Sequence, residues 1–138
     1  MLTGETNLPA LLRTLRPSQQ PGTYVFCTVP KLTGLDLRAA ISWFWEAEGY
    51  TLILPQAAAD QLNLAYDYVA AWLTLEVHSA LAAVGLTAAV AGALAQVGIS
   101  CNVVAAFYHD HLFVAAADAD RALATLHALA GQVGGFSF

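Results

Sequence analysis

The sequence predicts an α+β fold built from two similar halves in tandem, and three patterns support this prediction. Apolar and polar residues alternate strictly from Leu73 to His78, which is the signature of a half-buried strand. Large side chains then recur along one stripe of a small-residue helix expected over 86–97. A hairpin followed by a helix is expected at 40–62 and again at 102–130, each after a strand, so the pattern occurs twice.

A short helix is the first element expected from the N-terminus. Asn7 can cap it, and Pro9 suits its first turn. Its apolar stripe has helical spacing and comprises Leu8, Leu11, Leu12 and Leu15. Pro17 and the Pro21-Gly22 pair are expected to break the chain before an aromatic and β-branched strand over 23–29.

A tryptophan-rich hairpin is expected after a loop over 30–38. Two alternating sets follow in the chain, Ile41, Trp43 and Trp45 against Ser42, Phe44 and Glu46. Gly49 lies where a tight hairpin turn needs a positive φ angle. A helix through the tryptophans is the alternative. Pro55 ends the second strand, a short helix is expected over 56–62, and 63–68 links to the next strand.

The stretch between Glu76 and Asp110 contains no Asp, Glu, Lys or Arg, so a membrane span is an alternative to a packed helix. Alanine and glycine dominate the stretch, and no Lys or Arg cluster flanks it to set a topology. Its bulky side chains form one stripe that should be buried against a sheet, namely Leu86, Val90, Leu94 and Val97. This division favours the packed helix.

The last third of the chain predicts a hairpin and a helix. A tight turn is expected at His109-Asp110-His111, followed by a strand over 112–114. Asp118 is expected to cap a final helix with a face of Leu123, Leu126, Leu129 and Ala130, and Gly131 to end it. The tail over 132–138 is expected to be either a frayed end or a short edge strand.

Composition excludes some classes of function. The chain of 138 residues is 58% hydrophobic and only 11% charged, with a net charge of −5. Nucleic-acid binding is not expected, because phosphate contacts need clustered Lys and Arg. So little charge predicts apolar surface buried between the halves or between the subunits of a homodimer. Met1 leads into a polar start, and Cys27 and Cys101 lie in apolar runs, so a cytoplasmic protein with reduced cysteines is expected rather than a disulfide.

Several of these runs also resemble a known family. The segments GTYVFCTVP, WEAEGYTLILP, the block from LTLEVHS through VGLTAAV and GISCNVV to YHDHLFV, and ALATLHAL resemble small bacterial proteins with two ACT domains in tandem. The resemblance covers about residues 9–129. It implies two ferredoxin-like βαββαβ halves with antiparallel sheets and helices packed on one face. The expected division is 1–68 for the N-terminal half and 69–138 for the C-terminal domain.

The resemblance also implies where a ligand would bind. ACT-type ligands lie at interfaces between domains, between the loop after the first strand and the facing strand of a neighbour. In this chain the implied ligand-binding residues are His78, Ser79, Val84, Gly85, Leu86, Thr87 and Asn102. The residue pattern agrees at one point, because Gly85 before a helix can leave backbone N–H groups free to face a carboxylate. The alternative is that Gly85 only permits a tight turn.

The histidines could also indicate a metal site or a catalytic triad, but the sequence supports these two functions less well than ligand binding. His109, Asp110 and His111, with His78, carry groups that could bind a metal, but they flank a turn and no further cluster supports them. We therefore expect the aspartate to fix the turn and the histidines to pack or form hydrogen bonds. A triad of Ser79, His78 and Asp110 is not expected, because adjacent side chains on a strand diverge and no GxSxG motif is present.

The sequence therefore favours a non-catalytic regulatory protein that binds a small molecule such as an amino acid, with no cofactor, metal, nucleic acid or membrane partner. A structural or interaction module without a ligand is the first alternative, and a metal-binding protein or small enzyme the second. Trp43 and Trp45 are expected to be core or interface anchors, because no basic residues surround them as in a base-stacking platform.

Overall fold

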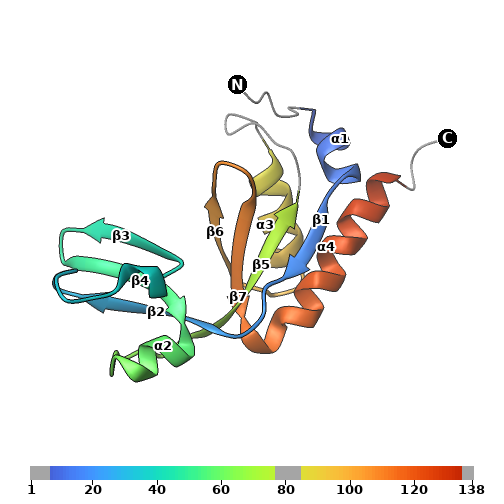
Figure 1. Cartoon of the computed structure of the whole chain (residues 1–138). Coiled ribbons are helices and arrows are strands. Elements are labelled where there is room, and N and C mark those ends of the chain that lie inside the picture. The colour runs from blue at the N-terminus through green and yellow to red at the C-terminus, as the bar shows by residue number, and fades with distance from the viewer. Residues whose placement is uncertain (1–6, 77–84, 135–138) are drawn as a thin grey trace. The chain divides into compact units, whose positions relative to one another are not determined.

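Strand β5 (Val69–Glu76) belongs to two units of the chain in the computed structural model, which describes residues 7–76 and 85–134. One unit is Pro21–Ala71, here called the central unit. The other, here called the split unit, combines Met1–Gln20 with Trp72–Phe138. The boundary falls inside β5, which is labelled in Figure 1. The strand up to Ala71 belongs to the central unit, and from Trp72 on it belongs to the split unit.

The central unit is an antiparallel sheet with one short helix. In chain order it contains β2 (Tyr24–Val29), the 3₁₀ turn η1 (Leu37–Ala39), β3 (Ser42–Glu46), β4 (Gly49–Pro55), α2 (Gln56–Gln61) and the start of β5. The strand order is β3-β4-β2-β5. Residues 30–41, between the first two strands, form no helix longer than the three-residue η1.

The β3–β4 hairpin confirms the expected strand assignment for the tryptophans. Glu46 pairs with Gly49 across a two-residue turn, and Phe44 pairs with Thr51. Gly49 has φ +146°, and a Cβ atom there would lie 2.8 Å from the carbonyl oxygen of Val29. Glycine is therefore required both by the backbone angle and by the close approach of β2.

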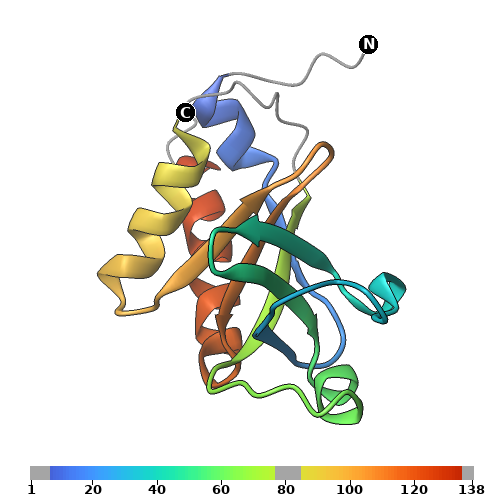
Figure 2. The ribbon, with the colours of Figure 1, turned by 90° about the vertical axis from the view of Figure 1, so that its left-hand side faces the viewer.

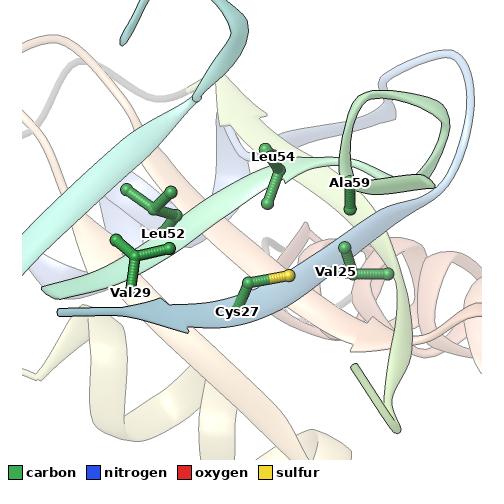
Figure 3. Packing of buried hydrophobic residues seen from close by; sticks show 6 residues of the cluster. All are labelled: Val25, Cys27, Val29, Leu52, Leu54 and Ala59. Carbon is green, nitrogen blue, oxygen red and sulfur yellow. The ribbon is translucent and has the colours of Figure 1, made fainter. Parts of the chain in front are cut away.

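One side of the β2–β4 pair carries the core of the central unit (Figure 3). Its buried members are Val25, Cys27, Val29, Leu52, Leu54 and Ala59. They alternate along β2 and β4, as the period-2 pattern requires, and Ala59 reaches them from α2. Around them pack partly buried residues, so this core is small.

The split unit is a sheet covered by helices. Its elements are α1 (Leu8–Arg13), β1 (Arg16–Gln19), the rest of β5, α3 (Leu86–Gln96), β6 (Cys101–Ala105), β7 (Asp110–Ala115), the 3₁₀ turn η2 (Ala116–Asp118) and α4 (Ala119–Gly134). The strand order is β1-β5-β7-β6, and α3 and α4 lie on the same side of this sheet (Figure 2). The prediction of an α+β fold is confirmed in both units.

Strand β1 was not expected, because Pro17 indicated a break. The segment pairs antiparallel with β5, with Pro17 opposite Leu75 and Gln19 opposite Leu73. Proline is tolerated there because β1 is the outer strand of this sheet. The other N-terminal expectation is confirmed, since Asn7 Oδ1 accepts a hydrogen bond from the Ala10 N–H at 3.1 Å as the cap of α1.

Helix α3 buries most of its expected stripe. Leu86, Val90 and Leu94 are buried, but Val97 is 41% exposed, so that part of the prediction is wrong. The helix ends at Gln96, and the chain then reverses through Gly98, with φ +76°. Ile99 is buried in place of Val97, with its N–H bonded to the Leu94 carbonyl. Within the described residues, no helix combines the length and apolar character needed to cross a membrane.

Two boundaries near the C-terminus differ from expectation. The hairpin turn runs over 106–109, where the Ala106 N–H bonds to the His109 carbonyl, so Asp110 and His111 lie in β7 and not in the turn. Helix α4 continues past Gly131 to Gly134. A single glycine inside a helix costs only about 1 kcal/mol relative to alanine, which a long packed helix tolerates.

Candidate functional site

The expected ligand loop lies partly outside the described residues, and this applies to His78, Ser79 and Val84. Gly85 is the N-cap residue of α3 and has a left-handed conformation with φ +100°. No side chain among the described residues caps the helix there. Leu86 is buried in the core, so its side chain does not face solvent, whereas Thr87 is exposed in the first turn.

Asn102 lies at the other end of the split unit from Gly85. It is exposed near the start of β6, opposite Phe113 of β7, and the chain reaches β6 from the C-terminal end of α3. Helix α3 has 11 residues, which separates its ends by about 16 Å. One split unit therefore does not bring Gly85 and Asn102 together.

The turn between β6 and β7 lies at the same end of the split unit as the start of α3 (Figure 2). Phe107 and Tyr108 in this turn are both exposed, with their rings in an edge-to-face arrangement. This end of the split unit therefore carries exposed aromatic side chains as well as a helix start that no described side chain caps.

A chain of hydrogen-bonded side chains runs in the split unit from Gln20, the residue after β1, across β5 to β7. Trp72 Nε1 donates to His111 Nδ1 at 3.0 Å, and the Thr74 hydroxyl lies 3.2 Å from the same nitrogen. Gln20 Nε2 donates to the Thr74 hydroxyl at 3.0 Å. Since an indole N–H can only donate, His111 accepts at Nδ1 and carries its proton at Nε2 when neutral.

Burial determines the electrostatics of this chain of side chains. Desolvation, with His109 nearby, holds the pKa of His111 below its usual value, although Asp110 acts the other way. Burial also raises the pKa of the Asp110 carboxyl, against the opposing effect of the two histidines. The histidine is thus held neutral by its surroundings, which fits a packing and hydrogen-bonding role.

Metal and nucleophile chemistry finds no support in the part of the chain that the structure describes. Over residues 7–76 and 85–134, no group of three or more His, Cys, Asp or Glu side chains could hold a metal ion. Cys27 and Cys101 are free thiols, and burial raises the pKa of each, which disfavours the reactive thiolate. The triad considered above involves His78 and Ser79, which lie outside the described residues.

The central unit carries a hollow that the sequence did not indicate. It has a volume of about 440 Å³ and lies where β2 continues beyond its two pairs with β5. Its walls include Phe26, Thr28, Thr51, Tyr66 and Asp67. The only acidic or basic side chain among its lining residues is that of Asp67, so the hollow suits a neutral or cationic group better than an anion.

Part of this polar lining is already engaged. The Tyr66 hydroxyl donates to Asp60 at 2.7 Å and accepts from Gln56 Nε2 at 3.0 Å, and the Asp60 bond raises the Tyr66 pKa. The Thr51 hydroxyl bonds to Glu46. Among the described residues, the side chains of Thr28 and Asp67 form no hydrogen bond with another side chain, so these two polar groups of the hollow remain available. Sequence reasoning missed Tyr66 and Asp67 because they lie in a segment read as a linker.

Comparison with known proteins defines the class to which this fold belongs. Family models described as the ACT domain match residues 3–71 and 68–128. The chain therefore belongs to the ACT-domain family and is a tandem ACT-domain protein with ferredoxin-like halves, as its residues suggested.

Two solved structures illustrate the similarity. A Vibrio cholerae protein, described as being of unknown function and a possible transport protein, is 44% identical with a TM-score of 0.81, over 89% of this chain and 95% of that one. The regulatory subunit of aspartate kinase from Thermus flavus is 9% identical with a TM-score of 0.55, over 93% and 97% of the two chains. The second likeness shows the fold alone. Among curated proteins, none matches significantly.

Proposed function

We propose that this tandem ACT-domain protein is a non-catalytic regulator that binds a small metabolite, an amino acid being the class that fits best, and acts as a cytoplasmic homodimer. The observation that supports this most strongly is the start of α3. No described side chain caps this helix, so no capping bond from the described residues occupies the backbone N–H groups of its first turn. A carboxylate is the group that such N–H groups and the helix dipole favour.

The second half of the proposed site comes from Asn102. Its amide offers both a donor and an acceptor, which suits the polar groups of an amino acid. Because Asn102 and Gly85 lie at opposite ends of one split unit, the site pairs the His78–Thr87 loop of one copy with the β6 strand of another. The proposal therefore needs association between copies, and the expected halves of 1–68 and 69–138 are the units that would carry it.

A thermal-shift screen against amino acids, nucleotides and metal ions tests the function. A ligand that binds only the native state raises stability by about 2.7 kcal/mol at a hundredfold excess over its dissociation constant. An amino acid giving a saturable rise in melting temperature is the expected result. If no compound raises it, the alternative of an interaction module without a ligand takes the place of this proposal.

Two substitutions then test the location. In Gly85→Asn the new side chain tolerates the left-handed conformation and can cap α3 itself, competing with the ligand carboxylate. We expect at least a tenfold weaker affinity by calorimetry on the folded variant, with a small loss of thermal stability, because the new Cβ atom would lie 3.2 Å from Leu8 Cδ2. Asn102→Ala should also weaken binding by about tenfold, as expected for roughly 1.4 kcal/mol of lost hydrogen bonding.

Asp67→Asn is the matched variant for the other location. It changes the one charge lining the hollow of the central unit and leaves the α3 end untouched. Unchanged affinity in this variant, with loss in the other two, supports the α3 site. The reverse pattern would assign the ligand to the hollow and remove Gly85 and Asn102 from the site.

A further inference from the structure

The hollow of the central unit lies where β2 loses one of its two partner strands. Strand β4 pairs with β2 along its whole length, from Tyr24 to Val29. Within the described residues, β5 pairs with β2 only at Tyr24 and Val25. The chain before β5 lines the hollow instead, at residues 65–67. The second half of β2 therefore has a partner strand on one side only, and it lines the hollow.

The alternation of hydrogen bonds along β2 shows which backbone groups face away from β4. The Gln56 N–H donates to the Thr23 carbonyl at 2.9 Å, which makes Tyr24 and its partner on β4 a non-hydrogen-bonded pair. Thr28 is four residues further along the same unbroken register, so its pair with β4 is of the same kind. The backbone N–H and C=O of Thr28 therefore point to the side where β5 no longer pairs.

Three carboxylates lie in the lining of the hollow or one hydrogen bond away from it. Asp67 is a lining residue. Asp60 accepts a hydrogen bond from the Tyr66 hydroxyl at 2.7 Å, and Glu46 accepts one from the Thr51 hydroxyl. Tyr66 and Thr51 both line the hollow, so these bonds hold two further negative charges next to it. Asp67 is the carboxylate of the three that is left to bind a ligand.

The basic residues of the central unit do not balance these charges. The unit contains only two of them, Lys31 and Arg38. Neither lines the hollow, and Arg38 forms an ion pair with Asp36 at 3.0 Å. A cleft whose charges have one sign concentrates ions of the opposite sign. The hollow therefore favours a positively charged ligand.

A primary ammonium group matches the polar groups that the hollow offers. It has three N–H donors and no acceptor, whereas the Asp67 carboxylate and the Thr28 backbone carbonyl are both acceptors. The aromatic side chains of Phe26 and Tyr66 in the lining add surface that attracts a cation and packs against an apolar body. The volume of about 440 Å³ is in the range of small-molecule sites.

We infer that the hollow is a binding site for a small organic amine, whose ammonium group lies between the Asp67 carboxylate and the Thr28 backbone carbonyl. This site goes beyond the proposed function, because it takes a cation and lies in the central unit, whereas the site at α3 takes a carboxylate. An amino acid would bring its own carboxylate close to Asp67, so the ligand expected in the hollow is an amine without one.

Calorimetric titration of the full chain with three compounds of similar shape tests the chemistry of the site. Benzylamine carries a positive charge at neutral pH, benzyl alcohol is neutral, and benzoate is negative. Physiological ionic strength screens the attraction between distant charges. Benzylamine should bind saturably, and the alcohol and benzoate should bind at least roughly tenfold more weakly, because they lack the charged donor.

Two matched variants and an NMR titration test the location. Asp67→Asn keeps the shape of the side chain and should weaken benzylamine binding at least roughly tenfold. Glu48→Gln removes one negative charge from an exposed residue of the β3–β4 turn, outside the hollow, and should leave the affinity unchanged. Both variants should melt close to the native chain. Benzylamine should shift the amide resonances of Thr28 and Asp67, and not that of Gly85.

Each contrary outcome overturns the amine site. Absence of saturable benzylamine binding removes it, and equal binding of benzylamine and benzyl alcohol shows that the hollow does not recognise an ammonium group. An equal loss of affinity in Asp67→Asn and Glu48→Gln shows a general attraction to a negative protein. Because benzylamine has no carboxylate, none of these results bears on the amino-acid site at α3, which stands or falls on its own thermal-shift screen.

Discussion

The two units of this chain follow the same order of strands but differ in what covers their sheets. The split unit has α3 between β5 and β6, and α4 after β7, both on one face of its sheet (Figure 2). The central unit has only residues 30–41 and η1 at the position of α3, and a six-residue helix, α2, at the position of α4. The two units therefore share one strand order, but the split unit has much longer helices than the central unit.

The difference sets the size of each core. The largest fully buried side chains of the chain belong mostly to the split unit, including Phe113, Leu94 and Leu126, whereas the core of the central unit rests on six residues of moderate size. The central unit also exposes the aromatic residues of β3. A sheet that loses a covering helix keeps less apolar surface away from water, and its remaining apolar surface is available for contacts with other molecules.

The largest effect is expected from core truncation, which sharpens this comparison. Leu94→Ala in the split unit should cost about 3–4 kcal/mol of unfolding free energy, because a fully enclosed leucine leaves a cavity that closes poorly. Leu54→Ala in the central unit should cost about 2–3 kcal/mol, since its partly exposed neighbours can collapse inward.

Denaturant titration measures the free energy of unfolding of both leucine variants. Val97→Ala is the control on the same helix as Leu94, and because Val97 is half exposed it should cost under about 1 kcal/mol. Equal losses for Leu54 and Val97 would contradict the description of Leu54 as a core residue of its unit.

A second effect, smaller than that of Leu94→Ala, tests the hairpin of the central unit. Gly49→Ala introduces a Cβ atom 2.8 Å from the Val29 carbonyl oxygen at a φ angle that alanine rarely adopts, so a loss of roughly 3 kcal/mol is expected. Gly34→Ala is matched in having a positive φ angle but has open space around it, and should cost only about 1 kcal/mol. A thermal melt of the two variants decides whether close approach matters beyond the backbone angle.

The smallest effect is expected from titration in the split unit. Because the fold lowers the pKa of His111, the neutral form is favoured in the native state, and this stability is present above about pH 6.5. It is lost as the pH falls from there toward the lowered native pKa. Protonation would also place a second donor against Trp72 Nε1.

Unfolding free energies between pH 5 and 8 check this expectation. Asp110 opposes it, since its raised pKa makes the native state bind a proton more readily at low pH, so the series is run in an Asp110→Asn background. There, His111→Gln should flatten the decline in stability below about pH 6.5. His127→Gln, at an exposed position on α4, should not, and an equal change in both variants would contradict the role of the Trp72 bond.

Some elements were predictable because their signal is local. Alternation predicted β5 and the β3–β4 hairpin, and Gly49 indicated the turn of that hairpin. Aromatic and β-branched residues predicted β2. The starts of α1 and α3 were recognised from Asn7 and Gly85, since a cap or a left-handed residue acts on its own helix. For the candidate site, the sequence predicted that Gly85 precedes a helix and that Asn102 lies on a strand. It did not predict that the two residues lie at opposite ends of the split unit, because this depends on the direction in which α3 crosses the sheet.

The sequence by itself therefore determined the α+β class, the tandem repeat and most strands, because periodicity and turn chemistry depend on near neighbours. Only the tertiary structure decided that Arg16–Gln19 is a strand, because its pairing partner lies more than fifty residues away on β5. The tertiary structure also decided that Thr74 is buried, because Gln20 and His111 lie where they can form hydrogen bonds with its hydroxyl. It also decided that Val97 is exposed, because α3 ends at Gln96 and Ile99 is buried in its place.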